Sequence, residues 1–282
     1  LDVEIQIKER NTGQISLGAG YSTATGAFMQ ASIAQNNFMG KGQNLSFSLS
    51  LSSTNKTYNL GFTEPYLFDT KWTAGGDVYS QNNTASSSLS YKRQGFDLRV
   101  GYPIFDYTRL FVTYKLEDTE ISSVSDPTID QSVENGIASI VRTSLVRDLR
   151  NNKFEPSKGY YLSLATEYSG LGGDKKWFKV EADGRYFFRV AGDLVFRSRL
   201  YVANLNEINS QTIPRTERFT LGGSRNLRGY SYEAIGPKAP YANESGNVFY
   251  YNTGGLFAAY TSIELEHPLA REAGLKWVVF FD

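Results

Sequence analysis

The chain has 282 residues, with 29 basic and 29 acidic side chains, a formal net charge of zero, one histidine and no cysteine. The balanced charge gives no electrostatic basis for binding nucleic acid, and the absence of cysteine excludes disulfides and thiolate metal sites. Because a single histidine cannot form a His-rich metal site, we expect no metal and no cofactor. No run of 18 apolar residues occurs, so the sequence predicts no transmembrane helix.

The first ten residues, LDVEIQIKER, form a strand-like unit in which apolar and polar residues alternate. A short break, Asn-Thr-Gly at 11–13, separates this unit from the rest of the chain. The chain begins with Leu rather than Met and shows no signal peptide. We therefore expect residues 1–10 to be the tail of an upstream module and residues 11–282 to form a second domain.

Alternation with a period of two residues dominates the second domain, and no 3.6-residue period persists for the length of a helix. In QNLSFSLSLSS, the apolar residues Leu45, Phe47, Leu49 and Leu51 fall on one face and serines fall on the other. Such patterns, joined by short turns at one end and longer polar loops at the other, predict about thirteen strands of a meander. The predicted strands are 15–21, 28–35, 43–53, 56–63, 71–82, 87–101, 109–121, 134–148, 159–169, 176–190, 194–206, 255–267 and 274–282.

Alternation alone does not say whether the apolar face meets lipid or a protein core. Several predicted strands run ten to fifteen residues, whereas a membrane-spanning strand needs about nine to eleven. In GYYLSLATEYSG, Tyr160 and Tyr168 bracket Leu162 and Leu164, as in the aromatic girdles of membrane barrels. We therefore predict an all-β fold, an antiparallel up-and-down transmembrane β-barrel. A large soluble β-sandwich is the alternative.

Thirteen strands cannot close an antiparallel barrel in the usual way, because the first and the last would run parallel. The chain also ends in Asp282 rather than in an aromatic residue typical of a closing strand. We therefore expect about three further C-terminal strands to be missing from this sequence.

The segment 207–254 shows no regular alternation and is too long for an ordinary connection, since most loops of this length are functional or disordered. It contains LGGSRNLRGY, with Leu227, Arg228, Gly229 and Tyr230 as its last four residues. This motif, preceded by ERFTLGGSRN, resembles the BamA family of outer-membrane protein assembly factors, within the superfamily of POTRA-bearing β-barrels. In that family a V/I/L-R-G-F/Y motif lies at the tip of a long sixth external loop that folds back into the lumen.

The resemblance covers essentially the whole chain. KERNTGQISLGAGYST resembles the passage from the last periplasmic POTRA domain into the first barrel strand, while NNFMGKGQ and FTEPYLFD resemble an early turn and hairpin. The resemblance implies a barrel of 16 strands, about 13 of them present here, in the outer membrane of a Gram-negative bacterium. Residues 1–10 then become the tail of the last POTRA domain, and residues 11–282 the barrel.

The function implied by the resemblance is a core insertase that folds and inserts β-barrel proteins into the outer membrane. Its implied partners are unfolded outer-membrane proteins, outer-membrane lipid and the accessory lipoproteins of an assembly complex. The sequence also shows no Walker glycine loop and no arranged nucleophile–base pair, so we expect no enzyme. The alternatives are a TamA-like or two-partner secretion transporter of the same superfamily, and a passive porin-like channel with large, steady conductance.

Arg228 carries a permanent charge and five donors, and inside a barrel it needs a carboxylate partner. Strand parity turns Glu264 and Asp282 toward the lumen, and the family has two lumenal acids at these places. We predict that both acids clamp Arg228, that Gly229 permits a close backbone approach and that Tyr230 packs on the inner wall. The alternative is a solvated Arg228, with Glu264 as one lumen-lining acid among many.

Two further features have two interpretations each. In ISLGAGYS, the predicted gate strand with Ile15, Gly18 and Gly20, the glycines indicate either barrel curvature and crowding or a weak seam with the final strand, which opens sideways in the family. A set of inward charges indicates either a selectivity filter or ordinary wet-wall residues, while Arg225 is expected to stay solvated or to make a secondary contact. The inward charges are Lys179, Glu181, Asp183, Arg185, Arg197 and Arg199.

Overall fold

A computed structural model describes residues 12–22, 26–84, 89–124, 126–270 and 272–282. Its main feature is one thirteen-stranded antiparallel sheet in which each strand pairs with the next along the chain, except that β11 pairs with β14. The expected POTRA tail at residues 1–10 lies outside the described residues. The strands of the sheet are β1 (Gly13–Ser22), β2 (Gly26–Phe38), β3 (Gln43–Ser52), β4 (Asn55–Glu64), β5 (Thr73–Asn83), β6 (Leu89–Phe105), β7 (Thr108–Val124), β8 (Gly136–Asp148), β9 (Gly159–Gly173), β10 (Trp177–Ala191), β11 (Leu194–Glu207), β14 (Phe257–Ala270) and β15 (Leu275–Phe281).

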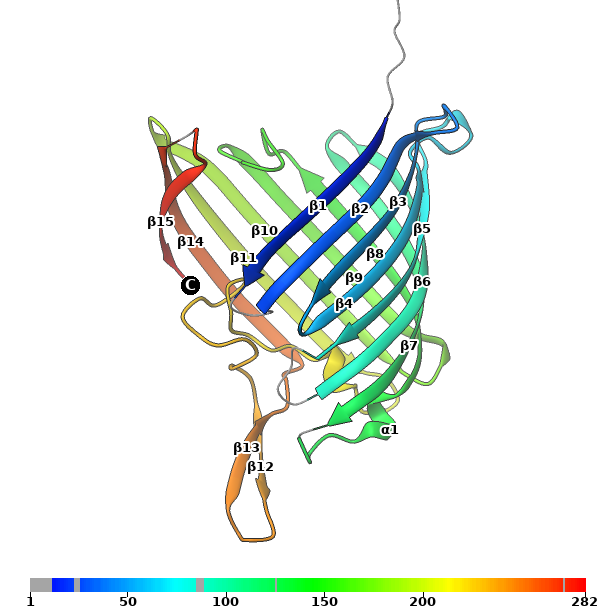
Figure 1. The fold of residues 1–282 in the computed structure, drawn as a ribbon, viewed down its shortest axis with the longest axis vertical. Helices are drawn as coiled ribbons and strands as arrows, with labels where there is room; N and C mark the ends of the chain where they lie inside the picture. The colour runs from blue at the N-terminus through cyan, green and yellow to red at the C-terminus, as the bar shows by residue number, and fades with distance from the viewer. Residues whose placement is uncertain (1–11, 23–25, 85–88, 125, 271) are drawn as a thin grey trace, which may run out of the picture.

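All thirteen expected strands are present, and each observed end lies within four residues of its predicted position. The sheet curls around a central space (Figure 1). The connections at the end where β1 begins have two to ten residues, and one of them contains η1 (Leu67–Asp69). The opposite end carries the two longest connections, the one with α1 (Gln131–Glu134) and the one between β11 and β14, but also turns of two and three residues, so the expected division into a short-turn end and a long-loop end is only partly correct. The strand order is that of an up-and-down sheet. The predicted meander is therefore confirmed.

The long connection between β11 and β14 contains structure that the sequence pattern did not predict. It includes η2 (Arg215–Glu217) and a hairpin of β12 (Lys238–Ala242) and β13 (Val248–Asn252), which projects beyond the end of the sheet (Figure 1). Both hairpin strands are only five residues long, and neither shows the apolar–polar alternation on which the prediction relied.

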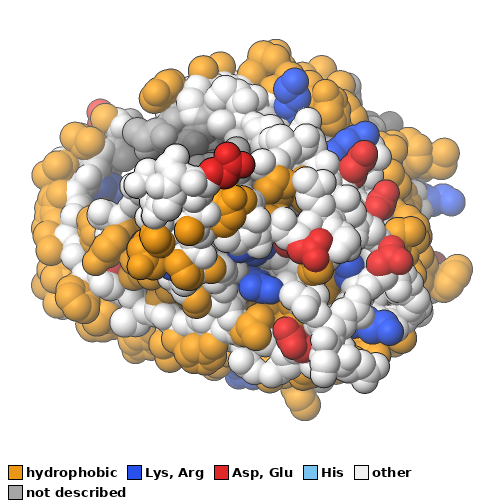
Figure 2. All heavy atoms as spheres, turned by 90° about the horizontal axis from the view of Figure 1, so that it is seen from below, with side chains coloured by type: hydrophobic (Ala, Val, Ile, Leu, Met, Phe, Trp, Pro, Cys, Tyr) orange, Lys and Arg blue, Asp and Glu red, His pale blue; other side chains and the backbone are white. Residues whose placement is uncertain are grey.

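Side-chain exposure settles which face of the sheet is apolar. Along β9, Glu167 and Ser169 are buried, whereas Leu162, Leu164 and Tyr168 are exposed. A soluble sandwich would have the opposite arrangement. Viewed from the end that carries β12 and β13, hydrophobic side chains line the outer rim, and acidic side chains gather inside it (Figure 2). The predicted transmembrane type of barrel is confirmed.

The serine-rich strand β3 obeys the same rule. None of Leu45, Phe47, Leu49 and Leu51 is buried, and 43% of Phe47 is exposed. Among the described residues, no helix is long and apolar enough to cross a membrane. The only apolar core cluster formed by the described residues lies in the interior near the loop end, where Ile213 of the long loop packs among four residues of the wall. Those residues are Ala138, Ile140, Trp177 and Leu205.

We expect Phe47→Arg to destabilise the full-length protein in phospholipid vesicles by about 2–4 kcal/mol, because the new charge faces the hydrocarbon near the middle of a strand. Ser48→Arg is the matched control, since its side chain points into the wet interior, and it should cost less than about 1 kcal/mol. Urea-induced unfolding gives both free energies. A larger loss for Ser48→Arg would show that the two faces are reversed.

Candidate functional site: a loop clamped inside the barrel

Directly after Ile213, the long loop meets the connection between β7 and β8 at η2. The Arg215 guanidinium pairs with the fully buried carboxylate of Asp126 and donates from Nη2 to the Thr128 hydroxyl at 2.7 Å. Glu134 accepts hydrogen bonds from the backbone N–H groups of Arg215 and Thr216. These contacts dock the entry of the loop onto an external connection.

Short-range hydrogen bonds within the connection between β7 and β8 shape that docking surface. Asp126 accepts a hydrogen bond from the N–H of Thr128 at 2.8 Å, which forms a tight turn. Asp130 caps α1 by accepting from the N–H of Ser132 at 2.9 Å. Glu134 is the last residue of this short helix, so the helix carries its carboxylate to the loop.

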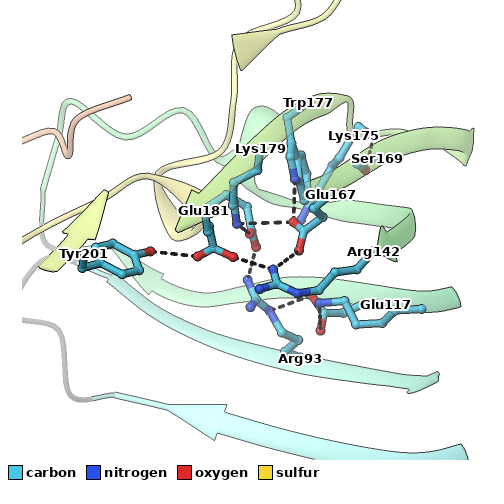
Figure 3. Close-up of polar contacts among 12 residues, drawn as sticks. Arg93, Glu117, Arg142, Glu167, Ser169, Lys175, Trp177, Lys179, Glu181 and Tyr201 are labelled. Carbon is cyan, nitrogen blue, oxygen red and sulfur yellow. Dashed lines mark hydrogen bonds and ion pairs between the residues drawn. The ribbon is translucent and has the colours of Figure 1, made fainter. Parts of the chain in front are cut away.

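Glu217, two residues after Arg215, lies between two cations of the wall. Its carboxylate accepts from Arg93 of β6 at 2.9 Å and from Lys179 of β10 at 3.4 Å. Arg93 also pairs with Glu117 at 3.1 Å, and Lys179 with Glu167 at 3.3 Å. Figure 3 shows these wall residues converging from several strands. Glu217 thus completes a network of alternating charges inside the barrel.

The electrostatics of Glu217 show how strongly this network holds it. Burial alone would raise the pKa of Glu217, but the charges of Arg93 and Lys179 outweigh burial and lower it to about 2, from an ordinary value of 4.5. The carboxylate therefore stays ionised at every physiological pH.

The tip of the loop is fixed by Arg228, which reaches both predicted acids. Its Nη1 donates to Glu264 at 2.6 Å, and its Nε donates to Asp282 at 2.7 Å. The backbone N–H of Arg228 also donates to Asp282, at 3.0 Å, and Nη2 donates to the Ser262 hydroxyl at 2.9 Å. Every nitrogen of the guanidinium has an acceptor, so the solvated alternative does not describe this arginine.

Two more contacts support the clamp. The guanidinium carbon of Arg228 lies 3.6 Å from the centre of the Phe280 ring, which is cation–π geometry. Ser262 donates to Asp282 at 2.7 Å, and only 4% of the Asp282 side chain is exposed. Hydrogen bonds to Asp282 raise the pKa of Arg228 above its usual value. The tip is therefore attached to β14 and to the residue directly after β15.

The structure corrects two details of the motif. A Cβ on Gly229 would meet nothing within 4 Å, so close backbone approach is not the reason for glycine there. The reason is a φ of +89°, which L side chains rarely adopt. Tyr230 was expected to pack on the inner wall, but 59% of it is exposed. Leu227 is partly buried and forms an isolated bridge with Gly223.

The predicted gate strand β1 is an edge of the sheet, and 75% of Ile15 is exposed. Among the described residues no strand pairs with its free edge. A Cβ on Gly20 would lie 2.7 Å from the Phe28 ring of β2, so Gly20 leaves room for this ring in its present position. A Cβ on Gly18 would meet nothing within 4 Å. Only one of the two glycines therefore leaves room for a neighbouring side chain.

The inward charges form paired clusters along the wall. Asp183 lies between Arg185 and Arg199, with distances of 2.7 and 2.8 Å. Arg197 pairs with Glu266, and Glu181 pairs with Arg142. These contacts fit wall residues rather than a row of free charges that would select ions. Lys179 does more than line the wall, because it also holds the loop through Glu217. Arg225 is exposed, as expected.

The anchors at Arg215 and Glu217 were missed because they lie in a segment without alternation, where parity cannot assign a direction. The sequence offered one signal on the wall. Strand parity directed Lys179 inward, but no partner was assigned to it. No group of three or more His, Asp or Glu side chains within the described ranges could hold a metal ion.

The barrel is antiparallel, its outer face is apolar, and a long loop is bound in its interior. These features together are typical of one class of outer-membrane barrels. The chain belongs to the Omp85 superfamily, because residues 37–282 match the Omp85 superfamily domain. It is 27% identical over its whole length to the outer membrane protein assembly factor BamA of Nitratidesulfovibrio vulgaris, and 28% identical to that of Neorickettsia risticii. The chain spans 35% and 38% of the length of these relatives.

The fold agrees with these matches. The crystal structure of BamA from Haemophilus ducreyi lacking POTRA domains 1–3 superposes with a TM-score of 0.84 at 23% identity, over 97% of this chain and 57% of that one. The relatives are named as outer membrane proteins, and the apolar outer face of the sheet agrees with this, so the expected location in the outer membrane is confirmed.

Replacing Glu217 with Gln should free the loop, because the change leaves Arg93 and Lys179 buried without this counter-charge at a cost of about 3–5 kcal/mol. Limited proteolysis of the full-length protein should then cut the loop faster. Glu244→Gln, on the exposed hairpin of the same loop, is the matched control and should change nothing.

The wild-type anchor should also respond to acid. Because the folded pKa lies below the ordinary one, the stabilisation is complete above pH 4.5 and is lost as the pH falls toward 2. Equal protease resistance of wild type and Glu217→Gln at neutral pH would contradict the anchor.

Proposed function

We propose that this chain is the barrel of a non-enzymatic insertase that folds β-barrel proteins into the outer membrane. The family and the names of its relatives, which are assembly factors, support this proposal. The observation that carries it is the Arg228 clamp, which keeps the tip of a long loop inside the barrel. A lumen held by such a loop fits a passive channel poorly.

In the proposed mechanism, the barrel opens sideways at β1, and unfolded outer-membrane proteins add as strands to the edge of β1 that this opening exposes. An unpaired edge offers a row of backbone donors and acceptors, which is the basis of β-augmentation. The client gains backbone hydrogen bonds before it enters lipid, where unpaired backbone groups are costly. The folding free energy of the client drives the step, so neither a nucleotide nor a covalent reaction is required.

The clamp has a mechanical role in this proposal. Glu264 belongs to β14, and Asp282 directly follows β15, so Arg228 holds the loop tip and the last two described strands together. The other end of the sheet, at β14 and β15, then keeps its shape while β1 exchanges partners. Accessory lipoproteins and outer-membrane lipid would contact the outer face of the barrel. A secretion transporter of the same superfamily is the second candidate, since it shares the barrel and the loop.

Arg228→Ala should release the loop tip and impair client assembly, because it leaves Asp282 and Glu264 without their shared cation, a loss of about 3 kcal/mol or more. The readouts are protease resistance of the loop and the rate of client insertion by the full-length protein in vesicles. Arg225→Ala, three residues away on an exposed side chain, should have a smaller effect on both.

Retained insertion together with retained protease resistance in Arg228→Ala would show that the clamp is dispensable. Lost protease resistance with unchanged insertion would separate the clamp from the proposed function. If the protein were a secretion transporter, the wild type would not insert clients. The Arg228→Ala variant would then lose export of an unfolded polypeptide instead.

Sideways opening can be tested with a disulfide between a cysteine in β1 and one in the strand that closes the native barrel. We expect the oxidised full-length protein to lose insertion, because clients can no longer pair with the β1 edge. Reduction should restore the wild-type rate and serves as the internal control. Insertion at the wild-type rate in the oxidised form would reject an opening at β1.

A further inference from the structure

A cavity of about 320 Å³ lies in the interior between the loop tip and the turn that joins β8 to β9. The turn supplies Lys153 and Phe154, the loop tip supplies Arg225, and strands β10, β11 and β14 supply the wall. Glu155 of this turn reaches Lys276 of β15 at 2.9 Å, so the turn extends across the space between β9 and β15. Three distant parts of the chain therefore enclose the cavity: the turn, the loop tip and the strands of the wall.

The lining of this cavity is strongly basic. Seven cationic side chains line it, and five carboxylates pair with them, so the cavity carries two positive charges more than negative ones. The cations are Arg150, Lys153, Arg185, Arg197, Arg199, Arg225 and Arg228, and their partners are Asp148, Asp183, Glu264, Glu266 and Asp282.

The excess can be assigned to particular groups. Among the described residues, neither the Lys153 ammonium nor the Arg225 guanidinium forms an ion pair, and both side chains are exposed at the cavity. Arg185 and Arg199 share a single carboxylate, that of Asp183. Uncompensated donors thus face one another across the cavity from the turn, the wall and the loop tip.

We propose that this cavity binds a phosphate group, either a free phosphate or a phosphate ester. A phosphate dianion matches the excess of two positive charges, and its oxygens can accept from donors that approach from several directions. A carboxylate carries one charge and is satisfied by a single planar arginine fork. The donors here come from three separate elements, which favours the tetrahedral anion. Bound phosphate would link the turn to the loop tip beside the Arg228 clamp.

The test uses full-length protein in a phosphate-free detergent, at constant ionic strength, with inorganic phosphate titrated by calorimetry. We expect saturable binding in the wild type, and at least ten-fold weaker binding in the double variant Lys153→Gln/Arg225→Gln. Lys92→Gln/Arg109→Gln is the charge-matched control, because neither of its exposed residues lines the cavity, and it should bind as the wild type does. Unchanged protease resistance of the loop should show that both double variants fold.

A wild type without saturable binding, or equal binding in the two double variants, would overturn the proposal. Acetate that competes as well as phosphate would overturn the choice of anion. Glycerol phosphate and a short-chain phosphatidic acid then distinguish the source. Tighter binding of the lipid would support a headgroup ligand, and equal binding would support a free phosphate. Because the readout is binding, its outcome does not depend on insertase activity.

Discussion

The structure depends on one constraint: a charge that is buried inside the barrel, away from water, needs a partner of opposite sign. An unpaired charge there loses hydration without compensation, and removing one member of a buried pair is costly. In this chain the constraint does more than stabilise the wall. Glu217 and Arg228 belong to the loop and find their partners on the wall, so charge pairing converts a segment without regular alternation into an ordered structure.

The wall was predictable because a strand has only two faces. Once the apolar face is assigned to lipid, parity turns Glu264 and Asp282 inward, and the resemblance to the family then singled them out as partners of Arg228. Parity gives no direction in the loop itself. Glu217 could therefore not be assigned to Arg93, which is 124 positions away, and the hairpin of β12 and β13 left no periodic signal. The role of Gly229 was misjudged because a positive φ cannot be distinguished from a close contact in sequence.

The two anchors differ in what they join. Glu217 pairs with β6 and β10, in the middle of the sheet, whereas Arg228 pairs with β14 and the end of β15. Only ten residues lie between them, so the loop limits how far apart these two parts of the wall can move. The basic cavity lies against the second anchor and is roofed by the turn between β8 and β9. An anion bound there would add a third connection across the same interior.

This arrangement divides the barrel into a braced part and a free part. Within the described ranges, the ion pairs of the loop reach β6, β10, β14, the connection between β7 and β8, and Asp282, but none reaches β1 to β5. Movement of β1 away from a neighbour on its free edge would therefore break no charge pair of the loop. Movement of β14 relative to β10 would separate Arg228 and Glu217 from their partners. In the proposed insertase, opening at the edge where a client strand would pair therefore costs no ion pair of the loop.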